Sequence, residues 1–181
     1  NAMTVQRMLQ KQGSIFSSTS DTETILHLIA TSKERDILAR FTDAVRQIEG
    51  AFSLVALTSK KMIGCRDPLG IRPLVLGDLD GSYILASETC ALDIIGARFV
   101  RDVENGEIVV ITESGVESLR PFPKIPPRPC IFEFIYFSRP DSFVPGRPGD
   151  QTRLNMGRVL ARENPPAPPA GNPVPHSRPP A

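Results

Sequence analysis

Two short segments of the chain bring together charged side chains that could bind a ligand or support a reaction. The first is Arg66-Asp67-Pro68-Leu69-Gly70-Ile71-Arg72, which brings two guanidinium groups and a carboxylate close together. Its composition predicts a tight turn, because aspartate opens turns, proline presets φ and glycine tolerates positive φ. An ion pair between Arg66 and Asp67 would hold such a turn. On the residues alone, this segment is interpreted as a structural turn.

The second segment is Ser20-Asp21-Thr22-Glu23. Ser20, with Glu23 three residues later, predicts a capping box at the start of a helix. Asp21 is favourable there because the N-terminal end of a helix is electrically positive. A carboxylate on the first helical turn is also held in place, and it could meet an ammonium group through a charge-assisted hydrogen bond. The residues alone explain Asp21 as part of the cap.

The periodicity of the apolar residues predicts the elements that carry these segments. Apolar positions recur at helical spacing in residues 4–12, 20–31 and 35–48. Ile25, Leu26, Leu28 and Ile29 are expected to bury the second helix. Residues 51–57 are nearly all apolar, as in a strand covered on both faces. Further strands are predicted at 62–66, 74–77, 83–87, 99–103, 107–112 and 116–119, with a helical excursion at 88–95.

Helices followed by a meander of short strands indicate an α+β fold with an antiparallel sheet. Asn105-Gly106 has the sequence of a tight hairpin turn. The amino-acid composition changes near residue 122, where a proline-rich linker begins. An apolar strand is predicted at 130–137 and a helix at 151–162. Many of the 18 prolines crowd residues 164–181, which predicts an extended or disordered tail.

Composition excludes several classes of function. Apolar residues make up 40 % of the chain, charged residues 23 %, and the formal charge is +1, so no nucleic-acid surface is expected. No apolar run approaches the roughly 18 residues of a membrane span, and no secretory leader is found. Cys65, Cys90 and Cys130 are interpreted as reduced thiols of a cytoplasmic protein. His27 and His176 are too few and too far apart for a histidine-based metal site.

The motifs resemble those of a known family. The loop from Arg66 to Leu74, with Ser87-Glu88-Thr89-Cys90-Ala91-Leu92 after it, is similar to glutamine amidotransferases that use an N-terminal cysteine nucleophile. Residues 98–109 and 130–142 narrow the resemblance to amidophosphoribosyltransferases. It implies part of an N-terminal-nucleophile sandwich with αββα layers and antiparallel sheets. Residues 1–122 would be a partial glutaminase domain, 123–163 a linker and the start of a phosphoribosyltransferase domain, and 164–181 the tail.

The resemblance also implies roles for individual residues. Asp21 matches the residue that pairs with the α-ammonium of substrate glutamine. A scaffold role around the site is carried over to the residues Ser20, Glu23, Arg66, Asp67 and Arg72. No catalytic residue and no metal ligand is assigned in this chain, and the Mg²⁺ of the family belongs to the phosphoribosyltransferase domain. Some relatives bind an iron–sulfur cluster at the position of Cys130, but one cysteine cannot hold a cluster, so none is expected.

The implied reaction is the first step of purine nucleotide biosynthesis, in which glutamine and phosphoribosyl pyrophosphate give phosphoribosylamine, glutamate and pyrophosphate. The family's nucleophile and oxyanion-hole Asn-Gly would precede Asn1, and its phosphoribosyl-pyrophosphate loop would follow the chain. The chain alone is therefore expected to be inactive. Its expected partners are glutamine, the missing upstream and downstream segments, and further copies in a homo-oligomer.

Two alternatives stay open at this point. The chain could be a non-catalytic scaffold that binds glutamine or a partner. It could instead be the matching part of an asparagine synthetase-like glutaminase, which shares an Arg-Asp-Pro-x-Gly loop. Residues 130–142 argue against that second alternative, because such enzymes do not usually carry this segment.

Overall fold

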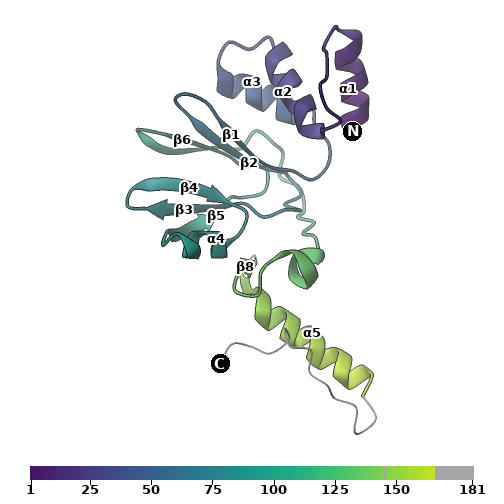
Figure 1. The fold of residues 1–181 in the computed structure, drawn as a ribbon, viewed down its shortest axis with the longest axis vertical. Coiled ribbons are helices and arrows are strands. Elements are labelled where there is room, and N and C mark those ends of the chain that lie inside the picture. The colour runs from purple at the N-terminus through teal and green to yellow at the C-terminus, as the bar shows by residue number, and fades with distance from the viewer. Residues whose placement is uncertain (145, 166–181) are drawn as a thin grey trace.

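Three amphipathic helices form the first layer of the molecule (Figure 1). The computed structural model describes residues 1–144 and 146–165. Phe41 and Val45 are fully buried and pack on Ile63 of the sheet below, as the helical periodicity predicts. The bounds of the helices are α1 (Ala2–Lys11), α2 (Asp21–Thr31) and α3 (Ile37–Arg46).

Local chemistry sets the ends of these helices. The Ser20 hydroxyl accepts a hydrogen bond from the Thr22 N–H at the start of α2, and the Asp36 carboxylate caps α3 in the same way. Gly13 follows α1 with a φ of +98°, a conformation that costs glycine little. One expectation is wrong: Leu26 is 62 % exposed, because it lies on the outer face of α2.

Two antiparallel sheets form the middle layers. The first has the strand order β1-β2-β6-β7 and the second has the order β4-β3-β5. Leu74 and Leu76 from the second sheet's side pack against Val109 of the first sheet, so the core between the sheets is apolar. The strands are β1 (Ser53–Leu57), β2 (Met62–Arg66), β3 (Val75–Leu79), β4 (Ser82–Ala86), β5 (Arg98–Asp102), β6 (Ile108–Thr112) and β7 (Gly115–Leu119).

The short helix α4 (Thr89–Ile94) covers the outer face of the second sheet. Its Leu92 is fully buried against Val75, and Gly77 of β3 leaves the space that the Leu92 side chain fills. The order of layers is therefore helices, sheet, sheet, helix (Figure 1). This arrangement confirms the predicted αββα sandwich with antiparallel sheets.

The turn at Asn105-Gly106 joins strands of different sheets. β5 pairs with β3, at the edge of the second sheet, whereas β6 pairs with β2 and β7 in the first sheet. The predicted hairpin at this turn is therefore wrong, although the turn itself is present, with the Glu107 N–H donating to the Glu104 carbonyl. The crossing between sheets cannot be read from the turn sequence, because the same Asn-Gly pair suits both arrangements.

The first strand is covered on one face only. Leu54 and Ala56 pack toward the helices, but Val55 and Leu57 on the other face are 53 % and 80 % exposed. The expectation of a strand buried on both faces is wrong here. The physical reason is position: β1 is the edge of its sheet, and the second sheet has fewer strands than the first.

A separate group of elements follows the linker. They are η1 (Glu133–Phe137), β8 (Phe143–Val144), β9 (Arg147–Pro148) and α5 (Gly149–Glu163), and α5 projects away from the sandwich (Figure 1). The strand predicted at 130–137 is wrong, because η1 is one turn of π-helix closed by the Ser138 N–H donating to the Glu133 carbonyl. Periodicity could not separate these outcomes, because a short apolar run suits a strand or a helical turn.

Further expectations concern membrane spans, the tail and the domain boundary. Among them, no helix combines the length and the apolar composition that crossing a bilayer requires. The proline-rich tail, predicted from residue 164, lies outside the described residues from 166 onward. The domain boundary predicted near residue 122 stays a prediction.

Candidate functional site

A cleft lies where the starts of α1, α2 and β1 meet. Its volume is about 320 Å³. The chain folds this way locally because α2 begins at Asp21, directly after its cap Ser20, and β1 begins after the loop that follows α3. The lining residues are Asn1, Ala2, Val5, Asp21, Thr22, Thr24, Ile25, Leu28, Ile48, Glu49, Gly50, Ala51, Phe52, Ser53 and Leu54.

Asp21 places a carboxylate in this cleft. It is the first residue of α2, and its side chain is exposed. Within the described residues, its carboxylate accepts one hydrogen bond, from the Thr22 hydroxyl at 3.5 Å. Among the described residues, the lining contains a second carboxylate, on Glu49, and no Lys, Arg or His side chain. A charge-assisted contact to a ligand ammonium is therefore open to Asp21.

Ser20 and Glu23 hold the start of α2, but not as a capping box. The Ser20 hydroxyl accepts from the Thr22 N–H at 3.3 Å, so Ser20 is the N-cap, but its partner is not the Glu23 N–H of a capping box. The Glu23 carboxylate instead accepts from the N–H groups of Ser17 at 2.7 Å and Ser18 at 2.8 Å. The reciprocal contact from Glu23 to Ser20 is replaced because the Ser20 N–H donates to the Ser18 hydroxyl. These backbone donors, Ser17 first, lower the pKa of Glu23.

Asn1 fixes the opposite rim of the cleft. Its side-chain amide donates to the Gln47 carbonyl at 3.0 Å and accepts from the Glu49 N–H at 3.0 Å. This two-way contact ties the start of α1 to the loop before β1. Sequence reasoning missed Asn1, because its partners lie 46 and 48 residues away along the chain.

The loop from Arg66 to Arg72 lies beside the cleft and does not enter it. Arg66 is buried, and its guanidinium donates to the carbonyls of Arg72 at 2.8 Å and Val103 at 2.9 Å. Burial lowers the pKa of Arg66, and the nearby carboxylates, Asp102 first, oppose that shift. Arg66 therefore acts as an internal brace for the loop.

Asp67 braces the same loop through backbone contacts. It is fully buried, and its carboxylate accepts from the Ile71 N–H at 3.2 Å. The ion pair expected between Arg66 and Asp67 is not present among the described residues, because each side chain bonds to backbone groups instead. The Asp67 N–H donates to the carbonyl of Phe52, which lines the cleft, at 3.0 Å.

Arg72 extends from this loop toward η1. Its Nη1 lies 2.6 Å from Oε1 of Glu133, and its guanidinium lies 4.5 Å from the ring centre of Phe137. Arg72 is thus a predicted scaffold residue that contacts the segment beyond the linker. The structure brings Asp21 to the cleft, with Ser20 beside it as the N-cap of α2, and it places Arg66, Asp67 and Arg72 in the adjoining loop.

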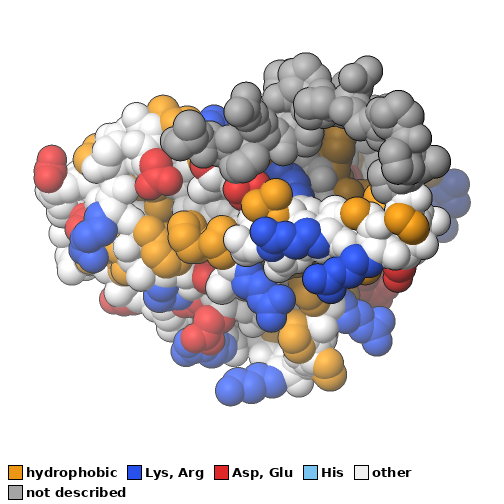
Figure 2. All heavy atoms as spheres, turned by 90° about the horizontal axis from the view of Figure 1, so that it is seen from below, with side chains coloured by type: hydrophobic (Ala, Val, Ile, Leu, Met, Phe, Trp, Pro, Cys, Tyr) orange, Lys and Arg blue, Asp and Glu red, His pale blue; other side chains and the backbone are white. Residues whose placement is uncertain are grey.

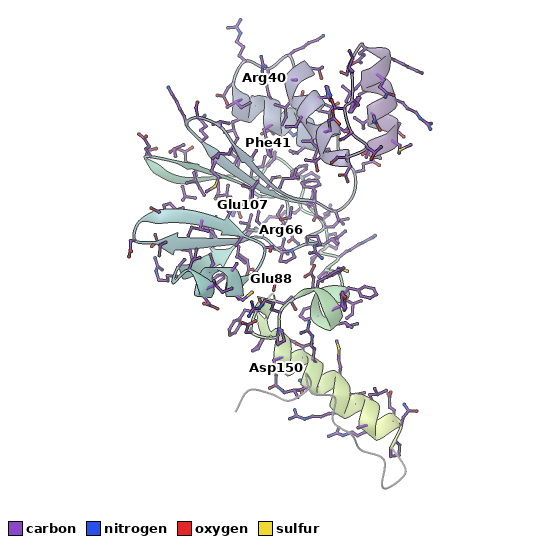
Figure 3. All side chains as sticks on the ribbon, in the orientation of Figure 1. Arg40, Phe41, Arg66, Glu88, Glu107 and Asp150 are labelled. Atoms are coloured by element: carbon purple, nitrogen blue, oxygen red, sulfur yellow. The ribbon has the colours of Figure 1, made fainter. Side chains whose placement is uncertain are left out.

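The segment Ser87-Glu88-Thr89-Cys90 also serves as a support. The Glu88 carboxylate accepts from the Arg139 N–H at 2.8 Å, and the Thr89 hydroxyl accepts from the Phe143 N–H at 2.9 Å. In Figure 3, Arg66 and Glu88 both lie on the side of the sandwich that faces the segment after the linker. The motif was recognised in the sequence, but these contacts across the fold were not predicted.

The three cysteines lie apart from the cleft lining. Cys65 is buried in β2, and burial, with the charge of Asp67, raises the pKa of its thiol to about 12. Such a thiol is a poor nucleophile at neutral pH. Among the described residues, no group of three or more His, Cys, Asp or Glu side chains is placed to hold a metal ion.

Comparison with known proteins gives consistent matches. Residues 1–93 match the family model described as "Glutamine amidotransferase domain". The amidophosphoribosyltransferase of Rhizobium etli is 50 % identical over 96 % of this chain and 38 % of that protein. The chloroplastic amidophosphoribosyltransferase 1 of Arabidopsis thaliana is 48 % identical over 91 % of this chain and 29 % of that protein. The chain therefore spans less than two fifths of the length of these relatives.

Solved structures agree with the sequence matches. A structure of the allosteric regulatory enzyme of purine biosynthesis superposes with a TM-score of 0.89 at 39 % identity, covering 92 % of this chain and 36 % of the other. The glutamine phosphoribosylpyrophosphate amidotransferase of B. subtilis, complexed with ADP and GMP, gives 0.88 at 40 % identity, covering 91 % and 36 %.

Proposed function

The chain belongs to the glutamine amidotransferase domain family, and on that premise we propose that its cleft forms part of the glutamine site of an amidophosphoribosyltransferase. The whole reaction releases ammonia from glutamine, which becomes glutamate. The ammonia then displaces pyrophosphate from phosphoribosyl pyrophosphate and gives phosphoribosylamine. This chain would supply the wall of the cleft and the frame around it. We place the protein in the cytoplasm, in keeping with its free thiols.

The placement of Asp21 carries the proposal. Its carboxylate lies on the first turn of α2, in a cleft where the described lining residues carry no cationic side chain. An amino acid presents an ammonium group, and Asp21 would accept a hydrogen bond from it. The helix end holds the carboxylate in position, since the Ser20 cap fixes where α2 begins.

The remaining predicted residues would act on the frame. Glu23 orders the loop before α2, and Arg66 and Asp67 brace the loop beside Phe52. None of the three cysteines is proposed as the nucleophile. The family's nucleophile is an N-terminal cysteine that uses its own α-amine as base, and Cys65, Cys90 and Cys130 have none to use.

Binding of L-glutamine to the chain tests this function. Isothermal titration of the wild type and of Asp21→Asn should give a dissociation constant about tenfold or more higher for the variant, the size of one lost charge-assisted hydrogen bond. Asp93→Asn is a matched control, because Asp93 is exposed on α4, away from the cleft. 4-Carbamoylbutanoic acid, which lacks the ammonium group, should bind the wild type and Asp21→Asn equally. Equal glutamine affinity in the wild type and Asp21→Asn would overturn the role of Asp21.

The bare face of β1 favours a second candidate, a non-catalytic module that binds a partner protein. Val55 and Leu57 are exposed on an edge strand, which is a common pairing surface. Light scattering after size exclusion would test it. If the wild type self-associates and Leu57→Lys is monomeric, a pairing role for this strand is supported. A wild type that is monomeric at all concentrations would show that the strand does not pair with a second copy.

A further inference from the structure

The loop from Arg66 to Leu74 lies between the cleft and the segment after the linker. On the cleft side, the Ser53 hydroxyl donates to the Pro73 carbonyl at 3.1 Å, and the Asp67 N–H donates to the Phe52 carbonyl at 3.0 Å. Ser53 and Phe52 both line the cleft. The rim of the cleft is therefore hydrogen-bonded to both ends of this loop.

On its other side, the loop contacts Glu133, the first residue of η1. Glu133 is 4 % exposed, and its Oε1 lies 2.6 Å from Arg72 Nη1. Among the described residues, that oxygen accepts no hydrogen bond of good geometry. Its charge is therefore balanced by the ion pair with Arg72. The cavity left between the loop and η1 is about 10 Å³, room for about one water molecule.

Arg72 contacts both sides of the loop, one through its backbone and the other through its side chain. Its carbonyl accepts from Arg66 Nε at 2.8 Å, and the next residue, Pro73, holds Ser53. Its side chain meanwhile contacts Glu133 and the ring of Phe137. Arg72 and its neighbour Pro73 therefore hold contacts to the rim of the cleft and to η1 at the same point of the loop.

We propose that Arg72 is a positioning residue that couples the cleft to the segment from Glu133 to Phe143. Docking of this segment on the loop fixes the Phe52–Ser53 rim, and a ligand held at the rim stabilises the docked segment in return. The two effects must be equal, because coupling between two equilibria is reciprocal. The inference rests on the proposed function in so far as the ligand is glutamine.

Amide hydrogen exchange followed by NMR tests the link without any ligand. The variants are Arg72→Met, which keeps the apolar stem, Glu133→Gln, which is isosteric, and the double variant. Arg98→Met is the control, because it breaks an exposed ion pair with Asp78 elsewhere. Arg72→Met and Glu133→Gln should each raise exchange about tenfold or more at both the Asp67 and the Ser138 amides. The double variant should add little beyond the larger single effect, since both remove one contact.

A change confined to Ser138, with Asp67 exchanging as in the wild type, would overturn the link. Titration with L-glutamine then separates the link from its function. Arg72→Met should raise the dissociation constant about fivefold or more, and Arg98→Met should leave it unchanged. Glutamine binding that depends on Asp21 but not on Arg72 would sink the coupling and leave the proposed function standing. If the wild type binds no glutamine, the proposed function fails, and exchange at Asp67 alone decides the link.

Discussion

Glu88 and Ser142, which lie 54 residues apart in the sequence, are joined by a hydrogen bond of 2.7 Å between the Glu88 carboxylate and the Ser142 hydroxyl. Ser142 is 1 % exposed, so this contact is sealed from solvent on the serine side. The same carboxylate oxygen accepts from the Arg139 N–H at 2.8 Å. One side chain at the start of α4 therefore fixes the segment through which the chain leaves the sandwich.

Replacing Glu88 should release this segment. In Glu88→Ala, the Arg139 N–H and the Ser142 hydroxyl both lose their acceptor, which costs about 1–3 kcal/mol in local stability. Hydrogen exchange at the Arg139 amide should therefore quicken about tenfold or more. Asp93→Ala, on the exposed side of the same helix, is the control. Unchanged exchange at Arg139 in Glu88→Ala would show that the segment is held by other contacts.

Exposed apolar side chains lie on both sides of this segment in the sequence. Phe132, Tyr136 and Phe143 are 54 %, 78 % and 60 % exposed, and Val159 and Leu160 of α5 add to the apolar surface. Figure 2, viewed from the side of α5, shows hydrophobic side chains exposed among Lys and Arg side chains. Glu88 and Arg72 contact the segment that carries this surface.

Glu107 should make the free energy of unfolding depend on pH. It is fully buried and accepts from Arg101 at 2.7 and 2.8 Å and from the Ser118 hydroxyl at 2.6 Å. Burial opposes its charge, but these hydrogen bonds outweigh burial and lower the pKa of Glu107. A lowered pKa contributes stability that is present above the ordinary value of 4.5 and is lost as the pH falls through the folded value.

Glu107→Gln tests this contribution. At pH 7 the variant should unfold about 1–3 kcal/mol more easily in urea, because the charge-assisted bonds to Arg101 weaken. The gap between wild type and variant should narrow as the pH falls below 4.5, since the unfolded wild type then binds a proton at Glu107 before the folded state does. A gap of constant size from pH 7 to pH 3 would contradict the lowered pKa.

The sequence predicts those parts of the fold that depend on neighbours along the chain. The helix start at Ser20 is local, because a serine hydroxyl caps the backbone two residues later. The layers follow from periodicity and from the family resemblance. Glu23 shows where local reasoning stops. The sequence predicts its side chain at the N-terminal end of α2, but not that the Ser17 and Ser18 N–H groups of the preceding loop donate to it.

Contacts between distant segments could not be predicted in this way. The turn at Asn105 leads from one sheet to the other, and no local signal distinguishes this from a hairpin. Glu133 begins a π-helical turn within an apolar run that resembles a strand. The partners of Asn1, Arg72 and Glu88 lie far along the chain, so only the folded structure shows what these side chains hold.

The cysteines should differ sharply in reactivity. The pKa of the Cys65 thiol is about 12, so at pH 8 only about one thiol in ten thousand is ionised, and the side chain is also buried. Cys130 is partly exposed. Iodoacetamide should therefore alkylate Cys130 in the folded chain long before Cys65, as measured by peptide mass spectrometry. Labelling in urea should reach all three cysteines, and equal rates for Cys65 and Cys130 without urea would argue against the buried thiol.

Gly70 should tolerate no side chain at its position in the loop. Its φ is +65°, and a Cβ there would collide with the side-chain amide of Asn105. The left-handed backbone costs a non-glycine residue about 1–2 kcal/mol, and the collision adds to this cost unless Asn105 moves aside. Gly70→Ala should therefore lower the free energy of unfolding by at least that amount in urea denaturation.

Adding Asn105→Ala separates the two causes. Asn105 is exposed, so its truncation removes the collision but leaves the backbone strain at position 70. The double variant should recover the steric part of the loss, relative to the cost of Asn105→Ala alone, and should retain about 1–2 kcal/mol. Full recovery would assign the whole effect to crowding. A single variant within about 0.5 kcal/mol of the wild type would mean that the loop rearranges, and that Arg66 no longer braces it through the Gly70 carbonyl.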